Sequence, residues 1–336
     1  MKYRFLGKSG LRVSELALGT QTFGWGADEK TAHLMANKFC EAGGIFFDTA
    51  NMYNNGASET MLGKWLRSQK CRHSLVIASK VFYPFGEGVN NFGLTRKNIL
   101  YAIENSLRTL GTDYIDIYQA HCFDDATPLE ETLSAFEDVV RSGKARYIGA
   151  SNYTPSQLVR SIMISNEHHW TSFSSLQAEY NLLVRSPEWE LLPTCEQEGL
   201  AYLVWSPLAG GWLTGKYQRN KQIPKDSRGG RRDRYGDLPE RRAGDHTFSV
   251  VETLVEIAKR LEKTPAQIAL NWLLRKSNNT IPIFGARTIE QFEENIASVG
   301  WKLASEDVRI LDEASDVPLP YPYWFIKKNG RPRKME

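Results

Sequence analysis

Four side chains of this sequence have the types that protonation of a carbonyl oxygen requires: an aspartate, a tyrosine, a lysine and a histidine. They are Asp48, Tyr53, Lys80 and His121. A tyrosine hydroxyl, with an ordinary pKa of about 10, becomes a stronger acid beside an ammonium group such as that of Lys80. Asp48 can keep Lys80 charged, and His121 can donate a hydrogen bond to the same oxygen. With a hydride from a cofactor, these groups suit the reduction of a carbonyl.

Each of the four residues also has an ordinary structural interpretation. Asp48 alone could cap a turn, Tyr53 could be a loop aromatic and Lys80 a solvated side chain. A metal site that uses both His121 and Cys122 is disfavoured, because neighbouring residues on a strand point to opposite faces. We therefore predict no metal, and the proton-transfer interpretation depends on a fold that brings the four side chains together.

Short apolar runs typical of buried strands alternate along the chain with segments of helical periodicity. The predicted strands cover residues 15–20, 45–47, 75–81, 114–121, 145–152, 174–179, 200–205 and 280–284. Eight strand–helix units favour a closed (β/α)8 TIM barrel, with a doubly wound open sheet as the alternative. We expect one domain over residues 1–336, an N-terminal hairpin over residues 3–13, a long loop after the seventh strand and extra helices near the C-terminus.

Capping residues predict several helix boundaries. Asp28 and Ser58 can each cap a helix, and Thr264 begins the pattern of a capping box. A further helix is expected over residues 187–198. The aromatic tail, residues 321–325, could shape the rim of a site or pack on the outside of the barrel.

The barrel would bring the four polar residues together. Ligand sites of parallel α/β folds lie at the carboxyl ends of the strands. Asp48, Lys80 and His121 fall at the ends of the second, third and fourth predicted strands, and Tyr53 lies in the loop after the second. We therefore expect them to converge on one face of the barrel.

Composition and charge indicate an ordinary soluble protein. Of the 336 residues, 41% are hydrophobic and 24% charged, and the formal net charge is +3. This balance gives no sign of a nucleic-acid or membrane partner. There is no signal-peptide pattern, and no apolar run approaches the roughly 18 residues of a membrane span. The four dispersed cysteines, Cys40, Cys71, Cys122 and Cys195, suit reduced thiols, so a cytoplasmic location is expected.

Three other chemistries fit the sequence less well. It has no Gly-x-Gly-x-x-Gly of a Rossmann site. Residues 210–216 imitate a phosphate-binding P-loop, but Tyr217 stands where a Ser or Thr would hold Mg²⁺. A hydrolase built on Asp48 and a second carboxylate would leave Lys80 without a role.

Seven ordered blocks give the chain a strong resemblance to the aldo-keto reductases over nearly its whole length. The blocks are Phe47-Asp48-Thr-Ala-x-x-Tyr53 with Gly-x-x-Ser58-Glu59, Ser79-Lys80, Tyr118-x-x-His121, Gly149-x-Ser151-Asn152, Gln177-x-x-Tyr180-Asn181, Trp205-Ser206-Pro207-Leu208 and Gly285-Ala286-Arg287. In that family the catalytic tetrad falls on Asp48, Tyr53, Lys80 and His121. The sequence is similar to the branch that includes bacterial general reductases and potassium-channel β-subunits.

The resemblance also implies NADPH as the cofactor, extended across the mouth of the barrel. Trp205 would stack on the nicotinamide, and Ser151, Asn152 and Gln177 would bond its carboxamide. The rest of the groove would be lined by Gly19, Thr20, Ser206, Leu208 and Gly285, with Lys216 and Arg228 at the pyrophosphate and Arg287, Gln291, Glu294 and Asn295 at the adenosine.

Arg287 supports a phosphorylated cofactor on physical grounds. It precedes a predicted helix N-terminus, which attracts anions, and a guanidinium binds phosphate bidentately. NADPH is therefore favoured over NADH. Gln291 has a second interpretation, as part of a capping box with Thr288.

An Arg-rich segment over residues 216–245 has three interpretations. It could be a solvated loop, a flap over the cofactor phosphates, or a contact for nucleic acid or an acidic protein. The substrate pocket is expected to be aromatic. Its candidate residues are Trp25, Phe82, Tyr83 and Phe123, together with Tyr53.

Two functions from different classes remain open. The first is an NADPH-dependent reductase of aldehydes, ketones or sugars with Tyr53 as proton donor. The alternative is a redox-sensing subunit that binds a partner protein and turns over very slowly, as the potassium-channel β-subunits suggest. The sequence indicates neither the carbonyl substrate nor the oligomeric state.

Overall fold

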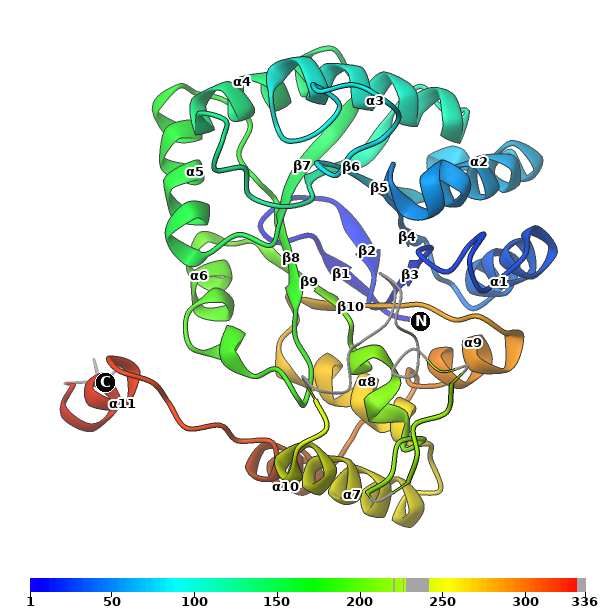
Figure 1. Cartoon of the computed structure of the whole chain (residues 1–336), viewed down its shortest axis with the longest axis vertical. Helices are drawn as coiled ribbons and strands as arrows, with labels where there is room; N and C mark the ends of the chain where they lie inside the picture. The colour runs from blue at the N-terminus through cyan, green and yellow to red at the C-terminus, as the bar shows by residue number, and fades with distance from the viewer. Residues whose placement is uncertain (220, 226, 228–241, 331–336) are drawn as a thin grey trace.

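The computed structural model of the chain describes residues 1–219, 221–225, 227 and 242–330. Eight parallel strands close into a barrel in the order β10-β3-β4-β5-β6-β7-β8-β9 (Figure 1). The strands are β3 (Ala17–Gly19), β4 (Phe46–Asp48), β5 (Val76–Val81), β6 (Ile115–Ala120), β7 (Ala145–Ser151), β8 (Ser175–Glu179), β9 (Ala201–Trp205) and β10 (Thr280–Phe284). All eight predicted strands are present, and the prediction of a (β/α)8 barrel is confirmed.

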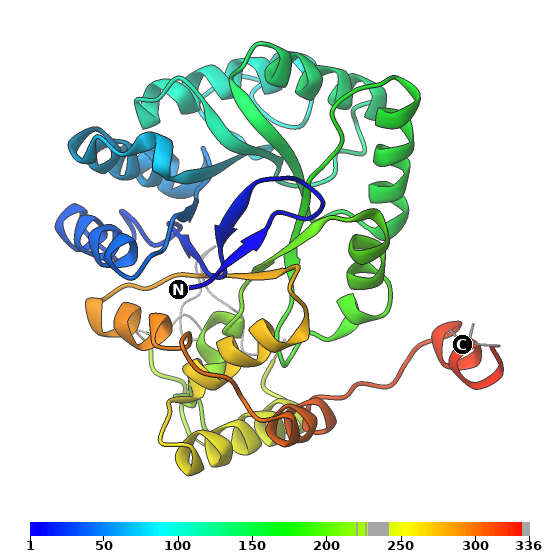
Figure 2. The same ribbon diagram turned by 180° about the vertical axis from the view of Figure 1, so that it is seen from behind.

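Helices surround the barrel, as Figure 2 shows from the opposite side. They are α1 (Glu29–Glu41), α2 (Ala57–Gln69), α3 (Arg96–Leu110), α4 (Leu129–Arg141), α5 (Pro155–Glu167), α6 (Leu191–Glu198), α7 (Asp245–Arg260), α8 (Pro265–Lys276), α9 (Ile289–Ile296), α10 (Ser305–Ala314) and α11 (Tyr323–Asn329), with short 3-10 turns η1 (Tyr53–Gly56), η2 (Arg72–Ser74), η3 (Ser186–Glu188) and η4 (Ala209–Thr214). Two predicted caps are confirmed: Asp28 accepts a hydrogen bond from the Thr31 amide, and Thr264 forms a complete capping box.

Two helix predictions are wrong. Ser58 does not cap α2, because the helix already begins at Ala57, after Gly56 at φ 85°. The buried Ser58 hydroxyl instead donates to the Thr20 carbonyl at 2.8 Å. The helix expected over residues 187–198 is divided into η3 and α6, because Glu190 leaves the helical region at φ −141°.

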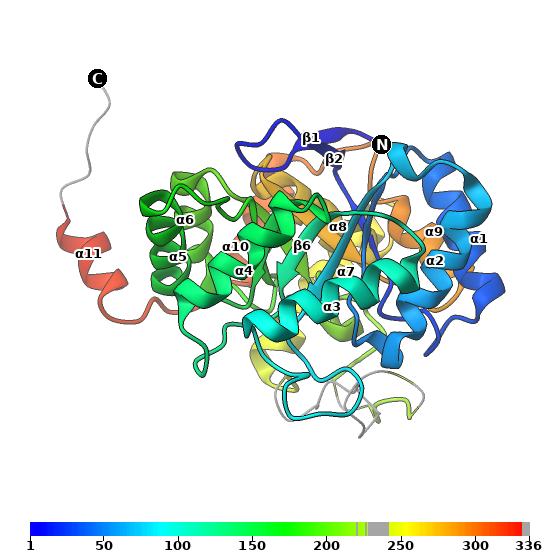
Figure 3. The same ribbon diagram turned by 90° about the horizontal axis from the view of Figure 1, so that it is seen from above.

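The N-terminal hairpin, β1 (Tyr3–Phe5) and β2 (Arg12–Ser14), closes one end of the barrel (Figure 3). Its Arg4 guanidinium donates to the Ser277 and Thr280 carbonyls, at 2.7 and 2.6 Å, where β10 begins. At the tip of the hairpin, the Lys8 amide donates to the Gly199 carbonyl, just before β9. The hairpin therefore covers the amino-terminal ends of the strands and leaves the carboxyl ends for a site.

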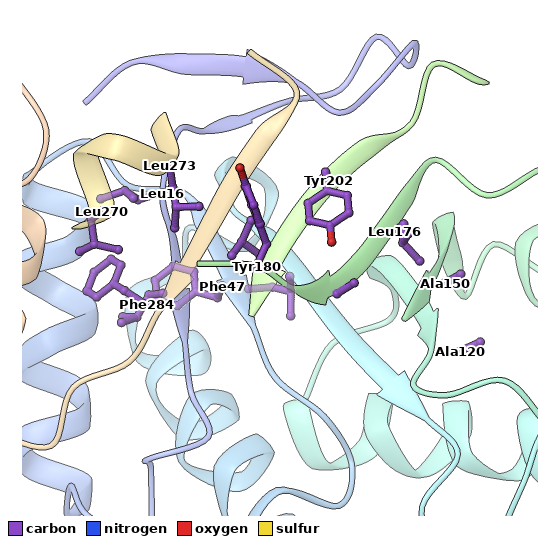
Figure 4. Packing of buried hydrophobic residues seen from close by; sticks show 14 of the residues in the cluster. Leu16, Phe47, Ala120, Ala150, Leu176, Tyr180, Tyr202, Leu270, Leu273 and Phe284 are labelled. Carbon is purple, nitrogen blue, oxygen red and sulfur yellow. The ribbon is translucent and has the colours of Figure 1, made fainter. Parts of the chain in front are cut away.

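The apolar core has two parts, separated by the barrel wall. Inside the barrel, inward side chains such as Phe46, Ala78 and Ile117 pack with Leu6 and Val13 of the hairpin. The larger part lies between the strands and the surrounding helices. Figure 4 shows some of it, with Leu270 and Leu273 of α8 near Phe284 and Leu16, and with Tyr180 beside Tyr202. Strand residues thus alternate between the interior and the helical layer.

The C-terminal α11 stands away from the barrel in all three views (Figures 1–3). Its Tyr323 ring packs against Trp189, with ring centroids 5.9 Å apart, on the outside of the barrel. Trp324, Phe325 and Ile326 are exposed. Of the two positions considered for the aromatic tail, only packing on the outside is observed, and only for Tyr323. Among the described helices, none combines the length and apolar character needed to cross a membrane.

Helices α2 and α3 approach closely at Gly63, which gives a stability prediction. A Cβ atom there would lie 2.5 Å from the Thr109 carbonyl oxygen, so the Gly63→Ala change must push the helices apart. We expect a loss of about 1–3 kcal/mol in urea unfolding, despite the better helix propensity of alanine. The matched control is Gly10→Ala, where no atom lies within 4 Å. A loss no greater than that of the control would contradict the tight crossing.

Candidate active site

Asp48, Lys80 and Tyr53 are in direct contact at the carboxyl end of the barrel. The Lys80 ammonium donates to Asp48 Oδ1 at 2.6 Å, to the Thr49 carbonyl at 2.8 Å and to the Tyr53 hydroxyl at 3.2 Å. Lys80 is fully buried and Asp48 is 2% exposed. The convergence expected from the strand positions is therefore present in the structure.

The second carboxylate oxygen of Asp48 is held by two amides. Gln177 Nε2 donates to Oδ2 at 2.8 Å and Gln119 Nε2 at 3.2 Å. Gln177 Nε2 also donates to Gln119 Oε1 at 3.3 Å. Because its amide hydrogens are used in this way, the Gln177 carbonyl oxygen is the atom available to a ligand. Sequence reasoning missed Gln119, although its spacing of two from His121 places both on the inner face of one strand.

Electrostatics favour a charged Lys80. Burial alone would lower the pKa of Lys80, but the charges and hydrogen bonds of Asp48 and Tyr53 outweigh burial and raise it. An ammonium at hydrogen-bond distance favours the phenolate form of a tyrosine. The arrangement therefore suits loss of the Tyr53 proton to a substrate.

His121 has the opposite character and is a neutral imidazole. Burial, and secondly the charge of Lys80, hold the pKa of His121 well below its ordinary value. Its ring makes edge contacts with Tyr53 and Tyr83, with centroid distances of 5.7 and 4.9 Å. A neutral imidazole keeps one N–H, which can donate to a carbonyl oxygen without placing a second cation beside Lys80.

A left-handed turn positions Tyr53. Asn54 and Asn55 both have φ of 53°, a region that asparagine tolerates better than most residues. The Asn54 amide donates to the Gln21 and Phe23 carbonyls at 2.8 and 2.7 Å. These bonds fasten η1 to the loop after β3 and fix the direction from which Tyr53 enters the site.

A cavity of about 710 Å³ opens above these residues. Its volume suits a large ligand. Thirteen of the fifteen candidate cofactor residues line it: Gly19, Ser151, Asn152, Gln177, Trp205, Ser206, Leu208, Lys216, Gly285, Arg287, Gln291, Glu294 and Asn295. Thr20 does not, because it is buried beneath, where its hydroxyl contacts Ser58 at 2.8 Å. Arg228 and most of the Arg-rich segment lie outside the described residues.

The two ends of the cavity differ in chemistry. Near His121, the indole of Trp205 donates to Asn152 Oδ1 at 3.1 Å, and Asn152 Nδ2 donates to the His121 carbonyl at 2.9 Å. At the far end, Arg287 lies just before α9. The Gln291 side chain accepts from the Arg287 amide at 3.0 Å, so Thr288 caps α9 without the reciprocal glutamine bond of a capping box.

Two of the four additional substrate candidates, Trp25 and Tyr83, line the cavity. Phe82 and Phe123 are not among its described lining residues. Phe82 packs against Phe92, with centroids 5.0 Å apart, and Phe123 against Tyr153, also at 5.0 Å. Met52, which sequence reasoning did not select, lines the cavity beside Tyr53. Within the described part of the chain, no cluster of three metal-binding side chains is present.

The neutral state of His121 predicts a pH dependence of stability. Its folded pKa is depressed, so the unfolded chain takes up the proton first as the pH falls below about 6.5. The contribution of His121 to the free energy of unfolding should then decrease by up to about 1.4 kcal/mol per pH unit. In urea unfolding between pH 5 and 7, the rise of this free energy with pH should therefore be smaller by that amount in His121→Asn than in the unmodified chain, where buried Glu59 also contributes. The control His73→Asn, at an exposed residue of η2, should keep the slope of the unmodified chain; a slope unchanged in His121→Asn would exclude a buried neutral His121.

Comparison with known proteins identifies the family of the chain. A sequence profile of the Aldo/keto reductase family matches residues 15–316. The uncharacterized oxidoreductase YrpG of Bacillus subtilis is 38% identical over 93% of this chain and 95% of its own length. A probable voltage-gated potassium channel subunit beta of Oryza sativa is 38% identical, covering 89% and 91%. The versiconal hemiacetal acetate reductase of Aspergillus parasiticus is 32% identical, covering 93% and 96%. The chain belongs to the aldo/keto reductase family.

Proposed function

We propose that this protein is an NADPH-dependent reductase that converts an aldehyde, ketone or sugar carbonyl into an alcohol. The observation that carries the proposal is the buried Lys80 ammonium, 2.6 Å from Asp48 and 3.2 Å from the Tyr53 hydroxyl. Aldo/keto reductases generally use NAD(P)H. Beyond this family property, we propose that the cofactor is NADPH, that Tyr53 is the proton donor and that the substrate is an aldehyde, ketone or sugar.

Each of the four polar residues has a separate role at the carbonyl oxygen of the substrate. When bound, NADPH supplies the hydride. Neutral His121 donates a hydrogen bond that orients the carbonyl and polarises it. As negative charge develops on the oxygen, Tyr53 gives up its proton, and the Lys80 ammonium stabilises the phenolate that remains. Asp48 keeps the ammonium fixed and charged.

The lining of the cavity fits NADPH. Trp205, partly buried and held by Asn152, offers a flat surface near His121 for a nicotinamide ring. The free carbonyl oxygen of Gln177 can accept from a carboxamide. At the other end, the guanidinium of Arg287 next to the α9 N-terminus suits a phosphate, which favours NADPH over NADH.

We expect Tyr53→Phe to lower kcat for a reactive aldehyde such as 4-nitrobenzaldehyde by about 10²–10⁴-fold, because the proton donor is removed. Binding of NADPH, followed by its fluorescence, should stay unchanged. Tyr83→Phe is the matched control, since Tyr83 also lines the cavity and contacts His121, and it should keep most of the rate. Retention of turnover by Tyr53→Phe within a few-fold would rule out Tyr53 as the donor.

We expect Arg287→Met to weaken NADPH binding about 10–100-fold, which corresponds to losing a charge-assisted phosphate contact. Methionine retains much of the aliphatic stem that packs against Gly26. Binding of NADH, which lacks the phosphate, should change little. Arg309→Met, at an exposed position of α10, serves as control. Equal weakening of NADPH and NADH would contradict a phosphate role.

A second candidate function is a redox-sensing subunit of a partner protein. The relative named as a potassium channel subunit beta, at 38% identity, is the observation that favours it. Such a subunit would bind NADPH tightly, reduce good aldehydes very slowly and co-purify with its partner. A screen of aldehydes, ketones and sugars that follows NADPH absorbance separates the two functions.

We also infer a cytoplasmic location. All four cysteines, Cys40, Cys71, Cys122 and Cys195, are free thiols in the structure. Thiols of this kind persist where the compartment is reducing. An NADPH-dependent reductase would find its cofactor in such a compartment.

A further inference from the structure

Glu59 is a buried carboxyl that the reaction described above does not use. It is the third residue of α2 and is 1% exposed. Its Oε1 accepts a hydrogen bond from Ser79 Oγ at 2.5 Å. A carboxyl buried in the layer between strands and helices is costly unless it is bonded or neutral, so its presence calls for a role.

The strand register places Glu59 behind Lys80, on the outer side of β5. In the pairing of β5 with β6, Ser79 lies opposite Tyr118, and the next pair is Lys80 opposite Gln119. Lys80 and Gln119 point inward to Asp48. Ser79, on the other face, points outward to Glu59, so Glu59 and Asp48 bond the neighbouring residues Ser79 and Lys80 from opposite sides of one strand.

We propose that Glu59 is a positioning residue for Lys80. It fixes the outer face of β5 through Ser79, and the charge on its carboxyl controls how strongly the Lys80 ammonium acts on Tyr53. The inference rests on the proposed carbonyl reduction, in which Lys80 strengthens Tyr53 as an acid.

The surroundings of Glu59 allow its charge to change near neutral pH. Burial raises the pKa of Glu59 to about 7, against the opposing effects of the Ser79 and Ser106 hydroxyls and of the Lys80 charge. The groups on its side of the sheet are Ser79 from β5, Ser106 from α3 and Tyr118 from β6, whose own pKa is raised by burial and by Glu59. Lys80 points to the other side of β5 and is the cation whose charge acts on Glu59.

The sign of the effect follows from charge. Below pH 7 the Glu59 carboxyl is largely neutral, and the Lys80 ammonium acts on Tyr53 unopposed. Above pH 7 the carboxylate offsets part of that positive field, so the Tyr53 phenolate is less stabilised. From the Coulomb interaction of these two charges inside the protein, we expect kcat to fall in a step of about three- to tenfold as the pH rises through about 7.

The test measures the pH profile of kcat for 4-nitrobenzaldehyde with saturating NADPH between pH 5.5 and 9. In the unmodified chain, kcat should fall in a step as the pH rises through about 7. Glu59→Gln keeps an oxygen for Ser79 but has no charge, so its kcat should stay at the higher value over the whole range. Glu137→Gln is the matched control, because Glu137 is a buried glutamate on α4 that bonds Thr171 and Arg141 instead. It should keep the step. A profile of Glu59→Gln identical to that of the unmodified chain overturns the inference.

A second readout does not depend on turnover. Ultraviolet titration of the cofactor-free protein, with Tyr53→Phe subtracted, gives the pH at which Tyr53 ionises. Glu59→Gln should lower this pH by about half a unit to one unit, and an unchanged value overturns the inference. If no carbonyl is reduced at all, the proposed function fails, while this titration still reports on Glu59.

A further variant covers the case in which Glu59→Gln does not fold. Ser79→Ala removes the hydroxyl that bonds Glu59 and lowers its pKa. It should move the midpoint of the kcat step to higher pH by about half a unit or more. A midpoint that stays in place in Ser79→Ala overturns the inference.

Discussion

The buried ion pair of Asp48 and Lys80 is the interaction on which the site depends. An ammonium with no exposure to water is stable only when its partners replace the lost hydration. Here three oxygens do so: a carboxylate, the Thr49 carbonyl and the Tyr53 hydroxyl. Two of these partners are structural, whereas the third would be the acid. The requirement to keep Lys80 solvated by protein thus also fixes Tyr53 at the distance where the ammonium favours its ionisation.

The barrel meets this requirement because the three anchoring residues come from neighbouring strands. Asp48 ends β4, Lys80 lies near the end of β5 and Gln119 near the end of β6. Parallel register brings their inward side chains together at the carboxyl end, and the hairpin fills the opposite end with apolar side chains. Removal of one member of such a buried pair leaves the other charge uncompensated, which typically costs about 3–5 kcal/mol. The same contacts therefore serve stability and chemistry.

Sequence reasoning recovers what depends on strand periodicity and motif position. The barrel follows from the strand pattern, and the grouping of Asp48, Tyr53, Lys80 and His121 follows from which strand ends carry them. The placement of Trp205 and Arg287 at one cavity is expected from the family resemblance. What it misses depends on the direction of single side chains. Ser58 suits an N-cap by type, yet Gly56, with its positive φ, occupies the N-cap position two residues earlier. Phe82 follows β5 as closely as a pocket residue would, but its ring packs into an aromatic cluster instead.

The site sets two basic residues to opposite charge states within one cavity. Lys80 keeps its proton because Asp48 and Tyr53 contact the ammonium, whereas His121 loses its proton because burial and the Lys80 charge both oppose a second cation. Because the pKa values of Lys80 and His121 are shifted in opposite directions, the two basic groups have different roles and do not compete for the same proton. A charged lysine stabilises a phenolate, and a neutral imidazole donates a hydrogen bond without attracting it. Since the Lys80 charge acts on both Tyr53 and His121, a carboxyl on the far side of β5 that altered this charge's field would affect the acid and the hydrogen-bond donor together.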